Sequence, residues 1–124
     1  MEVAQFALGF DFGTESVRVV VVDLRTGDPV GVSTRNYAHG VLDAKLPGGT
    51  PLPPDYALLH PQDWLDDAVG ACKEALKEAA AKPEQVVGIG VDFTSCTMLP
   101  CKADGTPLCL VSGFGNAPLA WPKL

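Results

Sequence analysis

Basic residues are scarce in this sequence: 9 Lys and Arg stand against 15 Asp and Glu, which gives a formal net charge of −6. This balance argues against bulk attraction to nucleic acid or to an anionic membrane surface. No apolar run approaches the length of a membrane span, and the first seven residues lack the basic start and long apolar region of a signal peptide. We therefore expect a cytoplasmic protein with no nucleic-acid or membrane partner.

Cysteine and histidine are also few, and their spacing does not form a known metal motif. The four cysteines form no C-x-x-C pair, and both histidines, His39 and His60, lie far from them in sequence. The cysteines are Cys72, Cys96, Cys101 and Cys109. The spacing of a zinc finger is therefore absent, and reduced thiols are expected.

Two common phosphate-binding motifs are missing as well. The sequence contains no G-x-x-x-x-G-K-[ST], so it has no P-loop. The stretch "GIGVDF", residues 88–93, has a G-x-G but no third glycine, and no helix is expected directly after it. A dinucleotide-binding fingerprint is therefore not indicated.

What the chain does contain is a pattern typical of an α/β fold. Hydrophobic residues make up 47% of its 124 residues and charged residues 19%, which is enough apolar material for a packed core. Apolar periodicity and turn residues predict the order β-β-β-α-β followed by a β-hairpin, with a mixed sheet. The expected strands are 7–12, 17–24, 30–37 and 86–93, the helix is 61–81, and the hairpin arms are 98–101 and 107–111.

Three of these segments carry more specific expectations. The strand 17–24 is nearly all β-branched, so we expect it to be buried on both faces. The helix begins at Pro61, which suits the first helical position, and carries an apolar face. That face comprises Trp64, Leu65, Ala68, Val69, Cys72, Leu76 and Ala79. Residues 39–60 are rich in Gly and Pro but hold Leu46, Leu52, Tyr56 and Leu58, which predicts a long structured loop with apolar anchors.

The first candidate site is "DFGTES", at the turn between the first two strands. Asp11 ends a strand, Gly13 lets a bulky anion approach the backbone, and Thr14 and Ser16 offer hydroxyl and amide donors. Asp11 could hold the magnesium that accompanies a nucleotide. Arg18 adds a positive charge nearby. A polar hairpin turn with a satisfied aspartate explains the same residues equally well.

The second candidate site is "GVDFTSCTMLP", where the strand 86–93 ends. Ligands of α/β sheets bind at the carboxyl ends of strands, and a row of small hydroxyls suits a polyhydroxylated ligand. The residues concerned are Asp92, Thr94, Ser95, Cys96 and Thr97. From the residues alone, capping of the turn backbone by Ser and Thr is the favoured interpretation, and a nucleophilic cysteine is a weaker one.

Three stretches together are similar to the beginning of the FGGY carbohydrate kinases, in the group that shares the ATPase fold of actin and Hsp70. They are "FDFGTESVRVVVVD", "LPPDYALLHPQDWL" and "VVGIGVDFTSCTMLPCKADGTPLCL", and the resemblance runs over about residues 8–110. It implies that residues 1–124 are the first part of an actin-like (ribonuclease H-like) domain, incomplete and without the second domain.

The resemblance implies an ATP- and Mg²⁺-dependent kinase that converts ribulose to ribulose 5-phosphate in L-arabinose breakdown. Residues matching the phosphate-facing turn are Asp11, Gly13, Thr14, Glu15, Ser16 and Arg18, with Asp11 toward the metal. Residues matching the sugar-facing segment are Asp92, Thr94, Ser95, Cys96 and Thr97. The family's catalytic aspartate would lie beyond Leu124, so this chain alone is expected to be inactive. Because the one expected helix can cover only one face of the strand 17–24, an uncovered face and an open sheet edge are expected to make the chain self-associate.

Two other functions remain open at this point. One is a non-catalytic half-domain that binds a sugar or a nucleotide. The other is a different actin-fold ATPase, in which "DFGTES" serves nucleotide hydrolysis and no sugar binds. The hydroxyl-rich segment "DFTSCT" argues against the ATPase, because a nucleotide alone does not require it.

Overall fold

The structure is a computed structural model that describes residues 3–124, and it divides them into two compact units. The first unit contains the described residues through Ala38 and Trp64–Thr94, and the second contains His39–Asp63 and Ser95–Leu124. Within residues 3–124 no helix combines the length and apolar character that crossing a membrane requires.

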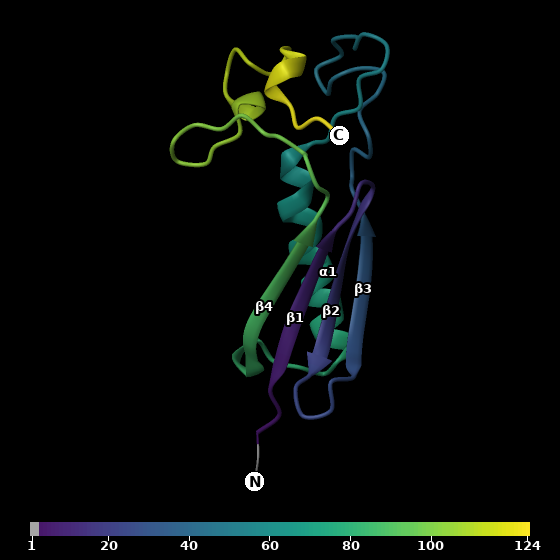
Figure 1. The fold of residues 1–124 in the computed structure, drawn as a ribbon, viewed down its shortest axis with the longest axis vertical. Coiled ribbons are helices and arrows are strands. Elements are labelled where there is room, and N and C mark those ends of the chain that lie inside the picture. The colour runs from purple at the N-terminus through teal and green to yellow at the C-terminus, as the bar shows by residue number, and fades with distance from the viewer. Residues whose placement is uncertain (1–2) are drawn as a thin grey trace. The chain divides into compact units, whose positions relative to one another are not determined.

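The first unit contains a four-stranded mixed sheet in the order β3-β2-β1-β4 (Figure 1). Its strands are β1 (Phe6–Phe12), β2 (Ser16–Asp23), β3 (Pro29–Asn36) and β4 (Val86–Phe93). The first three strands form an antiparallel meander, and β4 pairs with β1 in parallel. The predicted order β-β-β-α-β and the mixed sheet are confirmed, because the alternating and β-branched runs identify the strands.

Helix α1 (Pro61–Glu78) lies against one face of this sheet (Figure 1). Toward the sheet it buries Ala68, Ala71 and Ala75, which join a core with fully buried Val17, Val19 and Val21. The predicted helix face is wrong at Leu65 and Val69, which are 64% and 54% exposed. Its other members belong to the core or pack against it: Trp64, Ala68, Cys72, Leu76 and Ala79. The most buried positions against the sheet are alanines, which allow the helix backbone to approach the sheet closely.

The helix ends at Glu78, three residues before the predicted end. Ala80 has a φ of 52°, a left-handed conformation that does not continue an α-helix. The short 3₁₀ helix η1 (Pro83–Gln85) then leads into β4. The pattern of alanines in 79–81 favours a helix, but the turn that returns the chain to the sheet requires a different backbone.

The prediction that strand 17–24 is buried on both faces is wrong. The residues that point toward α1 are fully buried, but on the opposite face Arg18 is exposed and Val20 and Val22 are half-buried. In the described part of the chain α1 is the one α-helix, and it covers a single face of the sheet. β-branched residues on the other face therefore reflect strand propensity more than burial.

Strand β4 alternates as predicted but is exposed along its length. Its large apolar side chains keep more than half of their surface exposed: Val87 56%, Ile89 64%, Val91 59% and Phe93 70%. Strand β4 is also an edge of the sheet. Monomeric proteins rarely leave a row of large apolar side chains exposed on an open sheet edge.

The second unit has its own apolar cluster. The buried members are Leu46, Leu58, Cys109, Ala120 and Trp121, and the half-buried ones include Leu52 and Tyr56. The predicted loop anchors are therefore confirmed. The indole N–H of Trp121 donates to the carbonyl of Gly115 at 3.1 Å, so this buried ring is also satisfied as a donor.

The predicted hairpin forms only around its turn. The Lys102 N–H donates to the Thr106 carbonyl at 2.9 Å, and Cys101 bridges Pro107, as the Asp-Gly pair predicts. The expected arm 107–111 is instead the 3₁₀ helix η2 (Leu108–Leu110), and a further 3₁₀ helix, η3 (Pro118–Ala120), follows. The cause is local: Leu110 and Val111 donate their N–H groups back to Pro107 and Leu108, which closes a tight turn.

Candidate functional site

The turn between β1 and β2 is a tight hairpin held from the end of β3. The Gly13 N–H donates to the Ser16 carbonyl at 2.8 Å, which closes the turn. Tyr37 fixes it twice, because its hydroxyl donates to the Gly13 carbonyl at 3.0 Å and its N–H donates to the Glu15 carbonyl at 2.9 Å. Thr14 and Glu15 at the tip are exposed. The backbone of the turn is thus fixed while the tip remains open to a ligand.

Three charged side chains form a row across the sheet beside this turn. Asp11 on β1 pairs with Arg18 on β2 on one side and with Asp92 on β4 on the other. All three are exposed, and they lie on the face opposite α1, because their neighbours Val17 and Val19 point into the helix-facing core. The two predicted site aspartates are therefore adjacent.

A shallow groove of about 300 Å³ runs along the same face. It is lined by Gly9, Phe10, Asp11, Arg18, Val20, Gly90, Val91 and Asp92. A Cβ added at Gly90 would meet nothing within 4 Å, whereas one at Gly9 would lie 2.9 Å from the Val20 side chain. The glycines therefore give the groove a floor of bare backbone, which a bulky anion can approach.

A larger hollow of about 630 Å³ lies at the other end of these strands, around Gln5, Asp23 and Arg25. It is not at the carboxyl ends of the parallel strands β1 and β4, where ligands of such sheets bind. We therefore take the smaller groove as the candidate site.

The predicted sugar segment begins where β4 ends. The Thr94 N–H donates to the Phe12 carbonyl at 3.2 Å, which extends the pairing of β4 with β1 past the last strand residue. Ser95 and Cys96 follow in an exposed turn, and Cys96 has a φ of 66°, unusual for a residue with a side chain. Asp92 and Thr94 belong to the first unit, and Ser95, Cys96 and Thr97 follow them along the chain in the second.

The donors of the row match the chemistry of a magnesium nucleotide. Asp11 and Asp92 supply hard oxygen ligands on adjacent strands, and Mg²⁺ prefers a few carboxylates together with water and phosphate oxygens. Arg18 supplies a guanidinium that can pair with a phosphate. When bound, Mg²⁺ neutralises charge on the phosphates. The side chains of Asp11, Asp92 and Arg18 therefore fit the magnesium nucleotide that the sequence predicts.

Two of the cysteines have pKa values that make them poor nucleophiles at neutral pH. Burial raises the pKa of the Cys109 thiol to about 11, and burial also raises the pKa of Cys72. Both belong to or pack against the apolar clusters. We therefore assign them to packing.

One cluster of imidazole and carboxylate side chains was not predicted from the sequence. His39, His60 and Asp63 come together in the second unit, although the spacing of the histidines matches no metal motif. The signal that was available is that both ends of the glycine- and proline-rich loop 39–60 are histidines.

Comparison with solved structures gives the class of the fold. The chain superposes on a xylulose kinase from Brucella ovis with a TM-score of 0.60 and 23% identity, covering 82% of this chain and 19% of that one. A gluconate kinase from Lactobacillus acidophilus gives a TM-score of 0.64 and 16% identity, covering 83% of this chain and 18% of the kinase. The fold is therefore that of sugar kinases with an actin-like ATPase domain.

Sequence comparison finds more specific similarity, to one kind of sugar kinase. The chain is 43% identical over 121 residues to the ribulokinase of Geobacillus thermodenitrificans, which covers 97% of this chain and 21% of the relative. It is 43% identical over 122 residues to the ribulokinase of Mycolicibacterium smegmatis, covering 97% and 22%. No family model matches the chain. The chain is thus similar to bacterial ribulokinases, and it spans about a fifth of their length.

Proposed function

We propose that this chain is the amino-terminal portion of the first domain of a ribulokinase, which transfers the γ-phosphoryl group of ATP to ribulose. The observation that carries the proposal is the row of Arg18, Asp11 and Asp92 above the glycine-floored groove. The row lies at the carboxyl ends of two parallel strands, and the chain that builds it is 43% identical to a ribulokinase.

In this proposal the β1–β2 turn binds the phosphates. Gly13 and the exposed tip residues Thr14 and Glu15 lie beside the bound phosphates. Ser16 closes the turn, and Arg18 adds a positive charge. Asp11 holds the magnesium, directly or through water. Because Tyr37 holds the turn at two carbonyls, these groups are positioned before the ligand arrives, which is what phosphoryl transfer requires of a protein.

The segment after β4 binds the sugar in the same proposal. Asp92 and Thr94 mark the strand end, and the hydroxyl and thiol groups of Ser95, Cys96 and Thr97 follow it. Hydroxyl groups both donate and accept, so a row of them can satisfy the alcohols of a pentulose. We assign the general base that accepts the proton of the attacking hydroxyl to a part of the kinase outside this chain.

A chimaeric kinase provides the context for testing these roles. In it, this chain replaces the 121 matching residues of the Geobacillus thermodenitrificans ribulokinase. Replacing Ser95 by leucine in the chimaera is expected to raise the KM for L-ribulose on the order of tenfold, with the KM for ATP little changed, because a bulky side chain would block one sugar contact. Initial rates at varied sugar and varied ATP measure both constants.

The matched control for Ser95→Leu is Thr26→Leu. Thr26 is an exposed hydroxyl residue in the β2–β3 turn, at the other end of the sheet strands, and its substitution should leave both constants unchanged. Equal weakening of sugar and ATP by Ser95→Leu would show a folding defect instead of a sugar contact. An unchanged KM for ribulose would remove Ser95 from the proposed sugar site.

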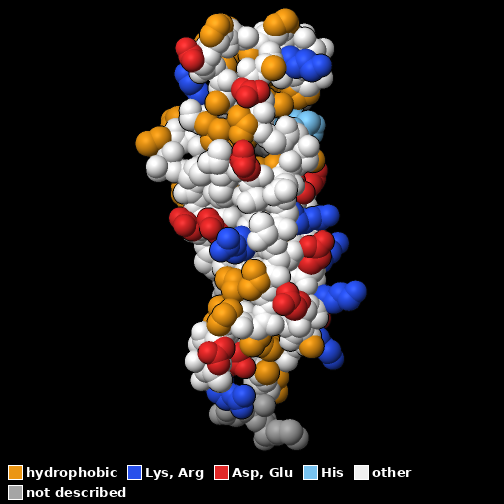
Figure 2. Space-filling view, turned by 90° about the vertical axis from the view of Figure 1, so that its right-hand side faces the viewer, with side chains coloured by type: hydrophobic (Ala, Val, Ile, Leu, Met, Phe, Trp, Pro, Cys, Tyr) orange, Lys and Arg blue, Asp and Glu red, His pale blue; other side chains and the backbone are white. Residues whose placement is uncertain are grey.

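We also propose that the isolated chain self-associates through β4. Its exposed row of Val87, Ile89, Val91 and Phe93 lies on an open edge, and covering two such side chains is worth roughly 3–6 kcal/mol. The opposite edge strand β3 is flanked by acidic and basic side chains, including the Arg35–Glu74 pair, and the face on that side shows charges of both signs interspersed (Figure 2). A charged edge resists pairing, so β4 is the expected contact.

Sedimentation velocity at micromolar concentration measures this association. We expect the chain to sediment as a dimer or larger species, and Ile89→Lys to shift it toward the monomer. Val30→Lys, at an exposed position on the other edge strand, should have little effect. A sharp monomer with cooperative thermal unfolding would contradict the proposal and would favour a self-sufficient half-domain that binds sugar or nucleotide without catalysis.

A further inference from the structure

Carboxylates of α1 accept outward-facing N–H groups along the free edge of β3. In an antiparallel pair only alternate residues bond to the neighbouring strand, and the others direct their N–H groups to the opposite side. On β3 the Val32 N–H donates to the Glu78 carboxylate at 3.2 Å, and just past the strand end the Ala38 N–H donates to Asp67 at 3.2 Å. Tyr37 directs its N–H inward, to the β1–β2 turn. The outer side of β3 is therefore bonded to the chain's own helix.

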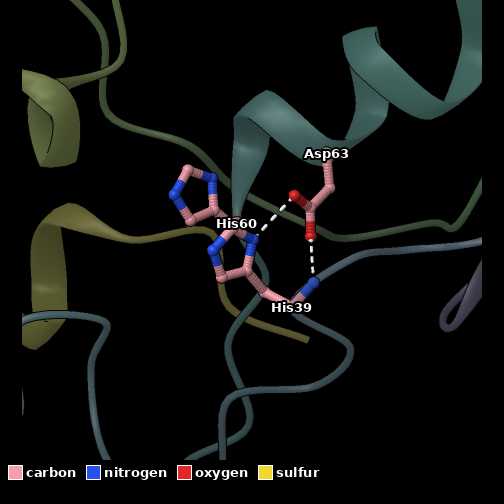
Figure 3. Close-up of side chains that lie close together, drawn as sticks. All are labelled: His39, His60 and Asp63. Carbon is pink, nitrogen blue, oxygen red and sulfur yellow. Dashed lines mark hydrogen bonds and ion pairs between the residues drawn. The ribbon is translucent and has the colours of Figure 1, made fainter.

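Two more carboxylates of α1 make contacts of the same kind. The Glu74 carboxylate accepts the Ser33 hydroxyl at 2.5 Å and pairs with the Arg35 Nε at 3.8 Å. Within the second unit, buried Asp63 accepts the His39 N–H at 2.8 Å and lies 2.7 Å from the Nδ1 of the His39 ring (Figure 3). The four acidic positions, 63, 67, 74 and 78, are spaced by four or seven residues, which places them on one side of an α-helix.

We propose that Asp67 and Glu78 prevent β3 from pairing with the β3 strand of a second copy of this chain. A strand that approached this edge would have to take the Val32 N–H from Glu78 and the Ala38 N–H from Asp67. Each carboxylate would then lie against the new strand without its hydrogen bond, and desolvating a charged acceptor in this way is costly. Covering an edge and placing charges beside it are two ways in which proteins protect edge strands.

A second copy is the partner that this edge fits once the two carboxylates are removed. Antiparallel pairing about a two-fold axis places the same strand opposite itself. On the side of β3 away from α1, the exposed residues Val30, Val32 and Thr34 are β-branched and uncharged. Such residues form strands readily, and no like charges among them would meet across the axis. Without its carboxylate acceptors, the β3 edge is therefore complementary to itself.

The test compares variants of the 124-residue chain that all carry Ile89→Lys. This substitution places a charge on β4, so the comparison does not depend on association through that edge. In this background the pair Asp67→Ala, Glu78→Ala frees two N–H groups and leaves the Arg35–Glu74 ion pair intact. We expect the pair to lower the dissociation constant for self-association by roughly tenfold or more, measured by sedimentation equilibrium. Alanine favours the helix, and circular dichroism checks that α1 is retained.

Two matched controls separate the hydrogen bonds from the charge. The pair Asp67→Asn, Glu78→Gln removes the same charge but keeps a carbonyl oxygen that accepts the N–H groups. The pair Asp43→Ala, Glu84→Ala removes two exposed carboxylates elsewhere in the chain. Both controls should associate no more tightly than the Ile89→Lys background.

An alanine pair that associates no more tightly than the background would overturn the proposal. An amide pair that associates as tightly as the alanine pair would also overturn it, because charge alone would then keep the edge from pairing. Glu78→Ala by itself tests the same claim with the least disturbance, because Glu78 is exposed at the last residue of α1. It should strengthen association in the same direction and make the Val32 amide exchange its hydrogen faster in the monomer.

Discussion

Asp11→Asn in the chimaeric kinase is expected to lower kcat on the order of a hundredfold or more while the KM for L-ribulose changes little. Asp11 lies beside Asp92 and Arg18 at the groove and is proposed to hold the magnesium of the nucleotide. An amide keeps the size of the side chain but removes its charge, so the metal would be held less firmly where phosphoryl transfer develops charge. Initial rates at saturating sugar and varied Mg²⁺ measure the effect.

Asp28→Asn is the matched control for this substitution. Asp28 is an exposed aspartate in the β2–β3 turn, at the opposite end of the strands, and its substitution should leave kcat unchanged. Partial recovery of Asp11→Asn at high Mg²⁺ would agree with a weakened metal site. Turnover equal to that of the unmodified chimaera at ordinary Mg²⁺ would remove Asp11 from the metal site.

Gly31→Ala is expected to lower the free energy of unfolding by about 3 kcal/mol. Gly31 is buried on β3 directly beneath α1, and a Cβ there would overlap the carbonyl oxygen of Ala75 and lie 2.9 Å from the Ala79 Cβ. Neither atom is the end of a flexible side chain, so the helix must move away from the sheet. Moving it opens the alanine contacts that form the core. Urea unfolding followed by circular dichroism measures the loss.

Gly70→Ala provides the contrast within the same helix. The nearest atoms to a Cβ at Gly70 all belong to the outer part of the Arg35 side chain, which is 42% exposed and can move aside. Replacing a helical glycine by alanine is worth up to about 1 kcal/mol, so this variant should be as stable as the unmodified chain or more so. Equal stability of the two variants would show that α1 does not pack closely on β3 at Gly31.

The strands could be predicted because alternation and β-branching are local signals. Strand β4 was predicted with its observed bounds, since glycine and aspartate alternate there with large apolar residues. The helix face was predicted less well. Leu65 and Val69 are large apolar members of the predicted face that stay exposed, whereas the most buried positions against the sheet are Ala68, Ala71 and Ala75. Hydrophobicity predicts which side chains can be buried, whereas the closeness of helix and sheet decides which are.

The candidate site was only partly accessible to sequence reasoning. Asp11 and Asp92 were each identified from a strand end, but their adjacency depends on the parallel register of β1 and β4. That register is set by the crossover through α1 and is not encoded in either motif. The same holds for His39 and His60, which become neighbours through the course of the loop between them. Contacts between distant segments are properties of the fold, and spacing rules do not reveal them.

The most direct test of the central claim is ATP-dependent phosphorylation of L-ribulose by the chimaeric kinase, measured by a coupled assay for released ADP. The proposed function predicts turnover comparable with that of the parent ribulokinase, with Mg²⁺ required and with negligible activity from the 124-residue chain alone. A chimaera that unfolds cooperatively and binds ATP but fails to phosphorylate ribulose would contradict the account. So would an isolated chain that phosphorylates ribulose at the rate of the parent enzyme.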